Sequence, residues 1–231
     1  NLAASLATFE KTVLVVDADP QANASSGLGV DIKEIDCSLY ECIIDHADVH
    51  DAVYTTDING LDVIPSHIDL VGAEIEMLNL KNRERVIKNM LDKIRDDYDY
   101  ILIDCLPSLG ILLTNALTAS DEVLIPVQAQ KFALDGLSQL QQVIEMVQQN
   151  INPALRLGGV LLTMVDNTNM SRAVEEALKG EFGSLLFTAQ IRKSVEAANS
   201  TYEQRSMVSH KGSPRGQEYR AVGAVFLGRE L

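Results

Sequence analysis

Three features are scarce in this 231-residue sequence, and each absence excludes a class of protein. Cysteine occurs three times, at Cys37, Cys42 and Cys105, without metal-ligand spacing. We therefore expect reduced cytosolic thiols rather than a disulfide framework or a metal centre. No apolar run approaches the roughly 18 residues of a membrane-spanning helix. No basic segment precedes an apolar one at the start, so no secretory signal is expected.

Linkers, internal repeats and low-complexity stretches are also absent. Residues 1–231 are therefore interpreted as a single domain, and this length fits one large α/β unit with a sizeable core. The hydrophobic content of 46% and the charged content of 23% are typical of a globular protein.

Positive charge is scarce over most of the chain. The net charge of -14 argues against indiscriminate binding to nucleic acid. Residues 192–231 differ, because they hold seven Lys or Arg against four Glu, a net +3, which leaves −17 on residues 1–191. This basic end indicates a contact with a polyanion, and a solvated helix surface is the alternative.

Apolar runs that end in carboxylates are the strongest pattern present. Residues 13–16 predict a strand buried on both faces, followed by Asp17, Asp19 and the ladder-breaking Pro20. A second run, 100–104, ends in Asp104. Further strands are expected over 63–64, 122–127, 157–165 and 185–191, and helices over 1–9, 39–44, 67–79, 82–97, 111–117, 133–149, 171–182 and 216–227. This alternation predicts an α/β fold with a mostly parallel sheet covered by helices on both faces.

Ligands of such sheets bind just past the carboxyl ends of the strands. Phosphoryl transfer to water needs a metal, donors to the phosphates and a group that positions the attacking water. Asp104 fits a Walker B aspartate that holds Mg²⁺ through water, the alternative being a strand-end carboxylate without a ligand. Asp19 fits a residue that orients the water, the alternative being a solvated turn residue.

Two of these segments resemble motifs of the ParA family of DNA-partitioning ATPases, a P-loop superfamily. Residues 17–29 resemble its switch I, and residues 104–110 resemble its switch II, with Leu106 in place of the usual first Pro. Further similarity covers nearly the whole chain and is found at 126–128, 133–136, 162–164 and 215–219.

The resemblance implies a P-loop NTPase-like doubly wound fold, an ATPase activity, and ATP and Mg²⁺ as cofactors. It assigns catalysis to Asp19 and Asp17, and the metal to Asp104. The switch residues are Pro20, Gln21, Asn23, Pro107 and Ser108. Nucleotide contacts fall on Thr163, Met164 and Arg192, and contacts to DNA on Arg192, Arg215 and Arg220.

The function implied is that of a cytoplasmic, nucleoid-associated ATPase. It forms a homodimer on ATP, binds DNA non-specifically, and is released when a ParB-like partner stimulates hydrolysis. One alternative is a MinD-like ATPase of the division site, which needs a basic amphipathic C-terminal helix, whereas residues 222–231 are short and interrupted by glycines. The others are a nitrogenase-reductase-like iron–sulfur protein, with Cys105 as a lone candidate ligand, and an inactive fragment of the fold.

The resemblance also places a Gly-rich phosphate loop with two lysines directly before a helix that matches residues 1–7. No such loop with its lysine occurs in the 231 residues. We therefore expect the first, central strand and the phosphate loop to be missing before Asn1. A chain of this kind is expected to fold poorly and to hydrolyse no ATP by itself.

Overall fold

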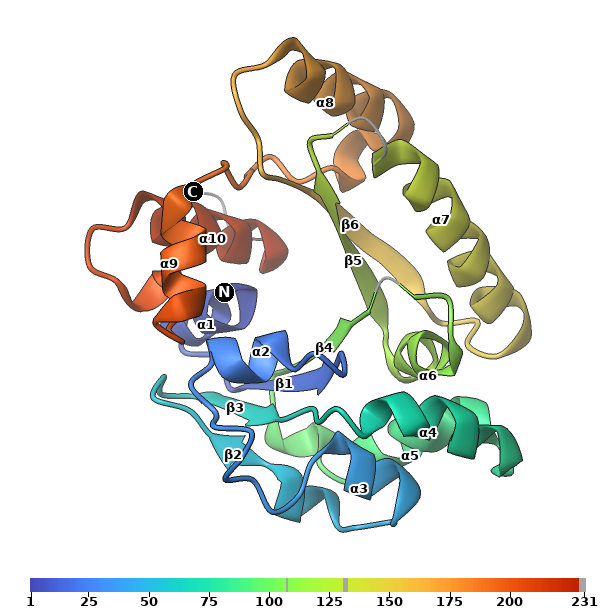
Figure 1. Ribbon diagram of the computed structural model, residues 1–231. Helices are drawn as coiled ribbons and strands as arrows, with labels where there is room; N and C mark the ends of the chain where they lie inside the picture. The colour runs from blue at the N-terminus through green and yellow to red at the C-terminus, as the bar shows by residue number, and fades with distance from the viewer. Residues whose placement is uncertain (107, 131–132, 229–231) are drawn as a thin grey trace.

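The computed structural model describes the chain except for residues 107, 131–132 and 229–231 (Figure 1). Its larger sheet has the strand order β2-β3-β1-β4. The strand β1 (Val13–Ala18) pairs in parallel with β3 (Leu61–Ile64) and β4 (Tyr100–Cys105), while β2 (Tyr54–Thr55) adds an antiparallel edge to β3. A second, two-stranded parallel sheet joins β5 (Glu122–Gln128) to β6 (Arg156–Thr163).

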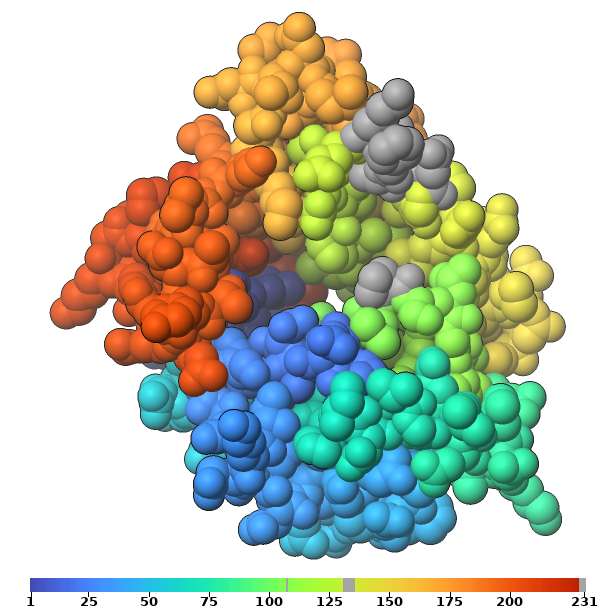
Figure 2. All heavy atoms as spheres, in the orientation of Figure 1, coloured from blue at the N-terminus to red at the C-terminus, as the bar shows by residue number. Residues whose placement is uncertain are grey.

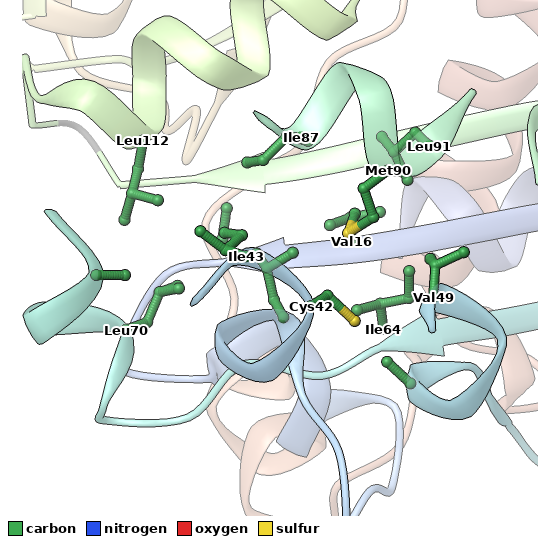
Figure 3. Close-up of a cluster of buried hydrophobic side chains, with 14 of the residues drawn as sticks. Val16, Cys42, Ile43, Val49, Ile64, Leu70, Ile87, Met90, Leu91 and Leu112 are labelled. Carbon is green, nitrogen blue, oxygen red and sulfur yellow. The ribbon is translucent and has the colours of Figure 1, made fainter. Parts of the chain in front are cut away.

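Every residue of β1 is buried, because helices cover both faces of its sheet. On one face, Val16 belongs to a cluster of buried side chains from four helices, and Figure 3 shows it close to Ile43 and Met90. On the other face, Val13 and Val15 pack against the first helix and the last. The helices are α1 (Leu2–Thr8), α2 (Asn23–Gly27), α3 (Leu39–Ile44), α4 (Leu70–Glu76), α5 (Val86–Leu91), α6 (Ile111–Ala119), α7 (Ala133–Asn150), α8 (Asn169–Phe182), α9 (Val195–Tyr202) and α10 (Pro214–Phe226).

Strands β4 and β5 do not pair with each other in the described part of the chain, so each keeps one open edge. A cavity of about 1480 Å³ lies between them, lined by side chains of both strands, by Asn1 and by Leu2. Figure 2 shows the hollow at the centre of this face, between the start of the chain and the segments that follow β4 and β5. The apolar side chains of β4 are consequently only partly buried.

The strand predicted over residues 185–191 is wrong, since this segment makes only isolated bridges, Val160 with Leu186 and Val165 with Arg192. The amide of Phe187 bonds to the carbonyl of Val160, and that of Ile191 to the carbonyl of Leu162. Between these two hydrogen bonds the segment advances four residues while β6 advances two. The ladder of hydrogen bonds is therefore interrupted.

The helix predicted over residues 82–97 is also shorter than expected. Only Val86–Leu91 is α-helical, between 3₁₀ turns at Arg83–Arg85 and Arg95–Asp97. The side chain of Asn115 accepts a hydrogen bond from the Ile87 amide (3.2 Å) and donates one to the Arg83 carbonyl (2.7 Å). It thus occupies the two backbone groups that an α-helix would join to each other.

Two helices lie where the sequence pattern indicated none, α2 and α9, because neither has a long apolar repeat. No helix of the described chain is long and apolar enough to cross a membrane.

Candidate functional site

The two strand-end carboxylates predicted to meet at one edge of the sheet do so. Asp17 and Asp104 are register partners on the neighbouring strands β1 and β4, and Asp19 follows two residues later. Both Asp17 and Asp19 act electrostatically on Asp104. Three carboxylates therefore share the carboxyl end of the sheet, beside the cavity that Asp104 lines.

Asp17 is fully buried and its carboxylate is engaged by the chain itself. One oxygen accepts hydrogen bonds from the Ser25 amide (2.8 Å) and hydroxyl (2.7 Å), and the other accepts one from the Asp19 amide (3.2 Å). The Ser25 hydroxyl in turn accepts a bond from the Ser66 amide (3.1 Å). Burial raises the pKa of Asp17, and the Ser25 bonds oppose that shift. Asp17 thereby fastens α2 to β1 and β3, and its catalytic role stays a prediction.

Asp19 begins a turn at the exit of β1. One carboxylate oxygen accepts a hydrogen bond from the Gln21 amide (2.8 Å), and the other makes none within the described residues. Pro20 beneath it is buried, whereas Gln21 and Asn23 are exposed. Ala22, at φ 53°, turns the chain into α2. The carboxylate is thus held by one oxygen and offers the second.

The Asp104 side chain lies in the wall of the cavity, where it is open to solvent yet crowded by protein atoms. This crowding, then the charges of Asp17 and Asp19, raise the pKa of Asp104 to about 6, and the ammonium of Asn1 opposes the shift. No described donor bonds to the carboxylate. A crowded, unpaired oxygen ligand next to like charges suits a divalent cation, and Mg²⁺ commonly takes one or two carboxylates plus phosphate oxygens.

The loop after β4 packs against α4. A Cβ at Gly110 would collide with the carboxylate of Glu74, so the Glu74 side chain lies directly against this loop. Ser108 and Leu109 are exposed on this loop, and Pro107 lies outside the described residues. Burial raises the pKa of Cys105 to about 12, so its thiol is not a reactive one.

Two of the three residues predicted to contact the nucleotide, Thr163 and Met164, lie at the end of β6, across the cavity. Thr163 lines the cavity, and its hydroxyl donates to the Val127 carbonyl (3.2 Å). Met164 has φ 53° and an exposed side chain. Arg192 is not among the cavity-lining residues; its side chain is exposed, 4.0 Å from Glu218. The structure thus brings Thr163 towards Asp104 and leaves Arg192 outside.

The three arginines predicted to contact DNA have different surroundings. Arg192 and Arg215 converge on Glu218, at 4.0 and 3.0 Å, and the Arg215 side chain is only 14% exposed. Arg220 donates to the Val208 carbonyl (2.7 Å). Two of the three are thus tied into the fold. The exposed cations of this stretch also include Lys193, Arg205 and Lys211, which contribute to the basic end of the sequence but belong to none of the motifs.

A family profile and similar known proteins agree on one family for this chain. A family profile described as "AAA domain" matches residues 1–157. The "Sporulation initiation inhibitor protein Soj" of Bacillus subtilis (strain 168) is 43% identical over 219 residues, which are 94% of this chain and 87% of that protein. The "Chromosome partitioning protein ParA" of Myxococcus xanthus (strain DK1622) is 40% identical, covering 100% of this chain and 82% of that protein.

Solved structures agree with the fold. The cobyrinic acid a,c-diamide synthase of Mycobacterium smegmatis, with bound ATP analog and magnesium, superposes with a TM-score of 0.78 at 35% identity, over 87% of this chain and 83% of that one. The apo McdA of Cyanthece gives a TM-score of 0.86 at 22% identity, over 98% of this chain and 94% of that one, and supports the fold alone. The expected P-loop NTPase-like fold is thereby confirmed.

Proposed function

This chain belongs to the ParA/Soj family of partitioning ATPases, and from that premise we propose that ATP binds at the carboxyl ends of β1 and β4 and is hydrolysed there. One observation carries the proposal. Asp17 and Asp104 stand in register on adjacent strands, and Asp19 follows at the same edge, beside a cavity of about 1480 Å³. This edge is where open α/β sheets bind their ligands.

The three carboxylates have different roles in this proposal. Asp17 holds α2 and the turn in place from the interior. Asp19, fixed by the Gln21 amide, presents its free oxygen to the attacking water and orients it. Asp104 is the residue that would hold Mg²⁺. Bound magnesium neutralises charge on the phosphates.

The donors to the β- and γ-phosphates are the part that the 231 residues do not supply, because they contain no Gly-rich loop with its lysine. In the proposal, a phosphate loop of the family's kind precedes Asn1. The position of Asn1 supports this placement, since Asn1 lines the same cavity as Asp104. Such a loop would approach the metal-holding carboxylate directly.

Replacing Asp19 tests the proposal, in the protein carrying such a loop. Asp19→Ala is expected to lower ATP turnover about 100-fold or more while leaving ATP affinity unchanged, because the orienting carboxylate acts on the transition state. Asp31→Ala is the matched control, since Asp31 makes the same kind of turn, its carboxylate accepting from the Lys33 amide (3.0 Å). Turnover and affinity are measured together. Equal turnover in the two variants would remove Asp19 from the mechanism.

We further propose that ATP induces a homodimer, that this dimer binds DNA non-specifically at the nucleoid, and that a ParB-like protein stimulates hydrolysis and release. The identity to chromosome-partitioning proteins supports this assignment. The MinD-like alternative is disfavoured by α10, which packs on α1 so closely that a Cβ at Gly223 would meet the Ser5 side chain. A helix held in this way is not free to lie on a membrane.

The exposed cations of the C-terminal stretch supply the DNA test. Lys193→Glu should reduce the affinity of the ATP-bound dimer for every DNA sequence alike and lower the salt slope by about one, as for a lost phosphate contact. Lys33→Glu, an exposed lysine near the opposite end of the chain, is the control. Binding to unrelated duplexes is measured across a salt series. A defect confined to one sequence, or no difference from the control, would contradict the assignment.

A further inference from the structure

Helix α4 exposes an apolar face. The helix predicted over 67–79 is confirmed for α4 and the 3₁₀ turn Met77–Asn79, whereas residues 67–69 lead into it without being helical. Four apolar side chains of this segment point to solvent. They are Ile68, Val71, Ile75 and Leu78, with 55, 56, 70 and 54% of their surface exposed. Their spacing of three, four and three residues places them on one side. The opposite side is the one that packs on the core, through Leu70, Ala73 and Met77. We call the four exposed residues the α4 stripe.

Single exposed apolar residues are ordinary, whereas a contiguous row of them marks an interaction surface. Other exposed apolar side chains, such as Met146, Met170 and Val195, stand on three different helices. Figure 2 shows the teal segment that contains α4 next to the blue segment after β1. Leu109, 56% exposed, belongs to the neighbouring loop that resembles switch II.

Carboxylates gather along one flank of the α4 stripe. The Tyr40 hydroxyl donates a hydrogen bond to Glu76 (3.1 Å). Desolvation raises the pKa of Tyr40, and so do this bond and the charges of Asp45 and Asp69. At the far end, the guanidinium of Arg83 is held by Glu84 and by the Leu78 carbonyl. The flank beside Tyr40 is therefore acidic, and Arg83, beyond Leu78, is already paired.

We propose that the α4 stripe is the docking surface for a cationic amphipathic helix of a partner protein. Apolar residues of that helix would cover the stripe, and its Lys or Arg side chains would meet the carboxylates of Asp45, Asp69 and Glu76. A second copy of this chain, placed with the same face opposite, fits poorly, because it would bring the carboxylates of this flank together.

Docking here bears on the candidate site through a direct contact. The Glu74 carboxylate lies against Gly110, in the loop that leads from Asp104. A helix bound along α4 therefore reaches the loop that follows the metal-holding residue. This coupling rests on the proposed function, whereas the docking itself is tested by binding without nucleotide. A failure of docking is therefore distinguishable from a failure of ATP hydrolysis.

The experiment uses a fluorescein-labelled synthetic helix of about 18 residues, with Leu on one face and Lys on the other, and a second peptide with every Lys replaced by Glu. Fluorescence anisotropy measures binding to the 231-residue protein and to the double variant Val71→Ser/Ile75→Ser. The control is Met146→Ser/Met170→Ser, which removes two other exposed apolar side chains, on α7 and α8. Circular dichroism checks that both variants keep the same helix content.

We expect the Lys peptide to bind, the Glu peptide not to bind, and Val71→Ser/Ile75→Ser to weaken binding about tenfold while the control changes it less than about twofold. Equal binding to both double variants would overturn the proposal by showing attraction to net charge alone. Concentration-dependent self-association without peptide, abolished by Val71→Ser/Ile75→Ser, would also overturn it and assign the surface to a second copy.

Discussion

Strands β1 and β4 are neighbours with the same kind of sequence, yet their environments differ. Residues 13–18 are all buried, because β1 has a paired strand on each side and helices on both faces. Residues 100–105 are almost as apolar, yet no residue of β4 is fully buried, because one edge of the strand faces the cavity. An apolar run thus predicts a strand, whereas its burial depends on the neighbours it finds.

The carboxylates at the ends of these strands differ in the same way. Asp17 is enclosed and accepts three hydrogen bonds, whereas Asp104 reaches the cavity and accepts none from the described residues. The closed side therefore serves structure, and the open side is available for ligands. Two kinds of change test this division. One fills the cavity beside β4 or removes the Asp104 charge there, and the other breaks the hydrogen bonds that enclose Asp17.

Filling the cavity should have the largest effect. We expect residues 1–231 alone to hydrolyse no ATP. Adding roughly 20 residues before Asn1, an apolar β-branched strand and a Gly-rich loop with Lys and Ser/Thr, should produce turnover. It should also raise Tm by about 10 °C or more, since 1 kcal/mol corresponds to about 2–4 °C at this size. Calorimetry and phosphate release measure the two effects.

The control for this addition keeps the loop and replaces the apolar residues of the added strand by Ser and Gly. It should lose the gain in Tm, because the walls formed by β4 and β5 stay uncovered. If the unextended chain unfolds cooperatively and hydrolyses ATP at the rate of the extended one, that result contradicts the idea that β4 and β5 need a further strand between them.

Opening the closed side should have an intermediate effect. Ser25→Ala removes the hydroxyl that donates to Asp17 and accepts from the Ser66 amide. The loss should lower the free energy of unfolding by about 1–3 kcal/mol, because a buried amide and a buried carboxylate lose a partner. Ser26→Ala, one residue later and partly exposed, is the control. Urea unfolding of both variants measures the difference, and equal midpoints would contradict the role of the Asp17 network.

Removing the charge of Asp104, which faces the cavity, should have the smallest effect on stability. Unlike Ser25→Ala, this change should stabilise the protein. The pKa of Asp104 is raised from 3.8 to about 6, so its contribution to stability is fully present below about pH 4 and is lost as pH rises through 6. Asp104→Asn removes that loss. It should stabilise the protein at pH 7.5 by about 1 kcal/mol, a value discounted because the side chain is open to solvent, and by nothing at pH 4.

Thermal unfolding at both pH values, without magnesium, tests this sign. Asp121→Asn, at the opposite end of the strands, serves as the reference. If Asp104→Asn is less stable than wild type at pH 7.5, neighbouring groups stabilise the Asp104 carboxylate, and the predicted sign is wrong.

Local sequence was sufficient to predict the strands that carry the site. The runs at 13–16, 100–104 and 122–127 were predicted within two residues, and the carboxylates of Asp17 and Asp104 meet where parallel strands end together. These features follow from local chemistry, because apolar β-branched runs form buried strands and their ends share an edge. The similarity of residues 17–29 and 104–110 to ParA motifs is local in the same sense.

Long-range contacts set the remaining features. They broke the helix predicted over 82–97 with the side chain of Asn115, held Arg220 at the carbonyl of Val208, and turned Ile75 to solvent although its spacing is that of a core face. They also left the edges of β4 and β5 apart. Each of these outcomes depends on a group distant in sequence, and periodicity records only which residues share a face, never which neighbour that face will meet.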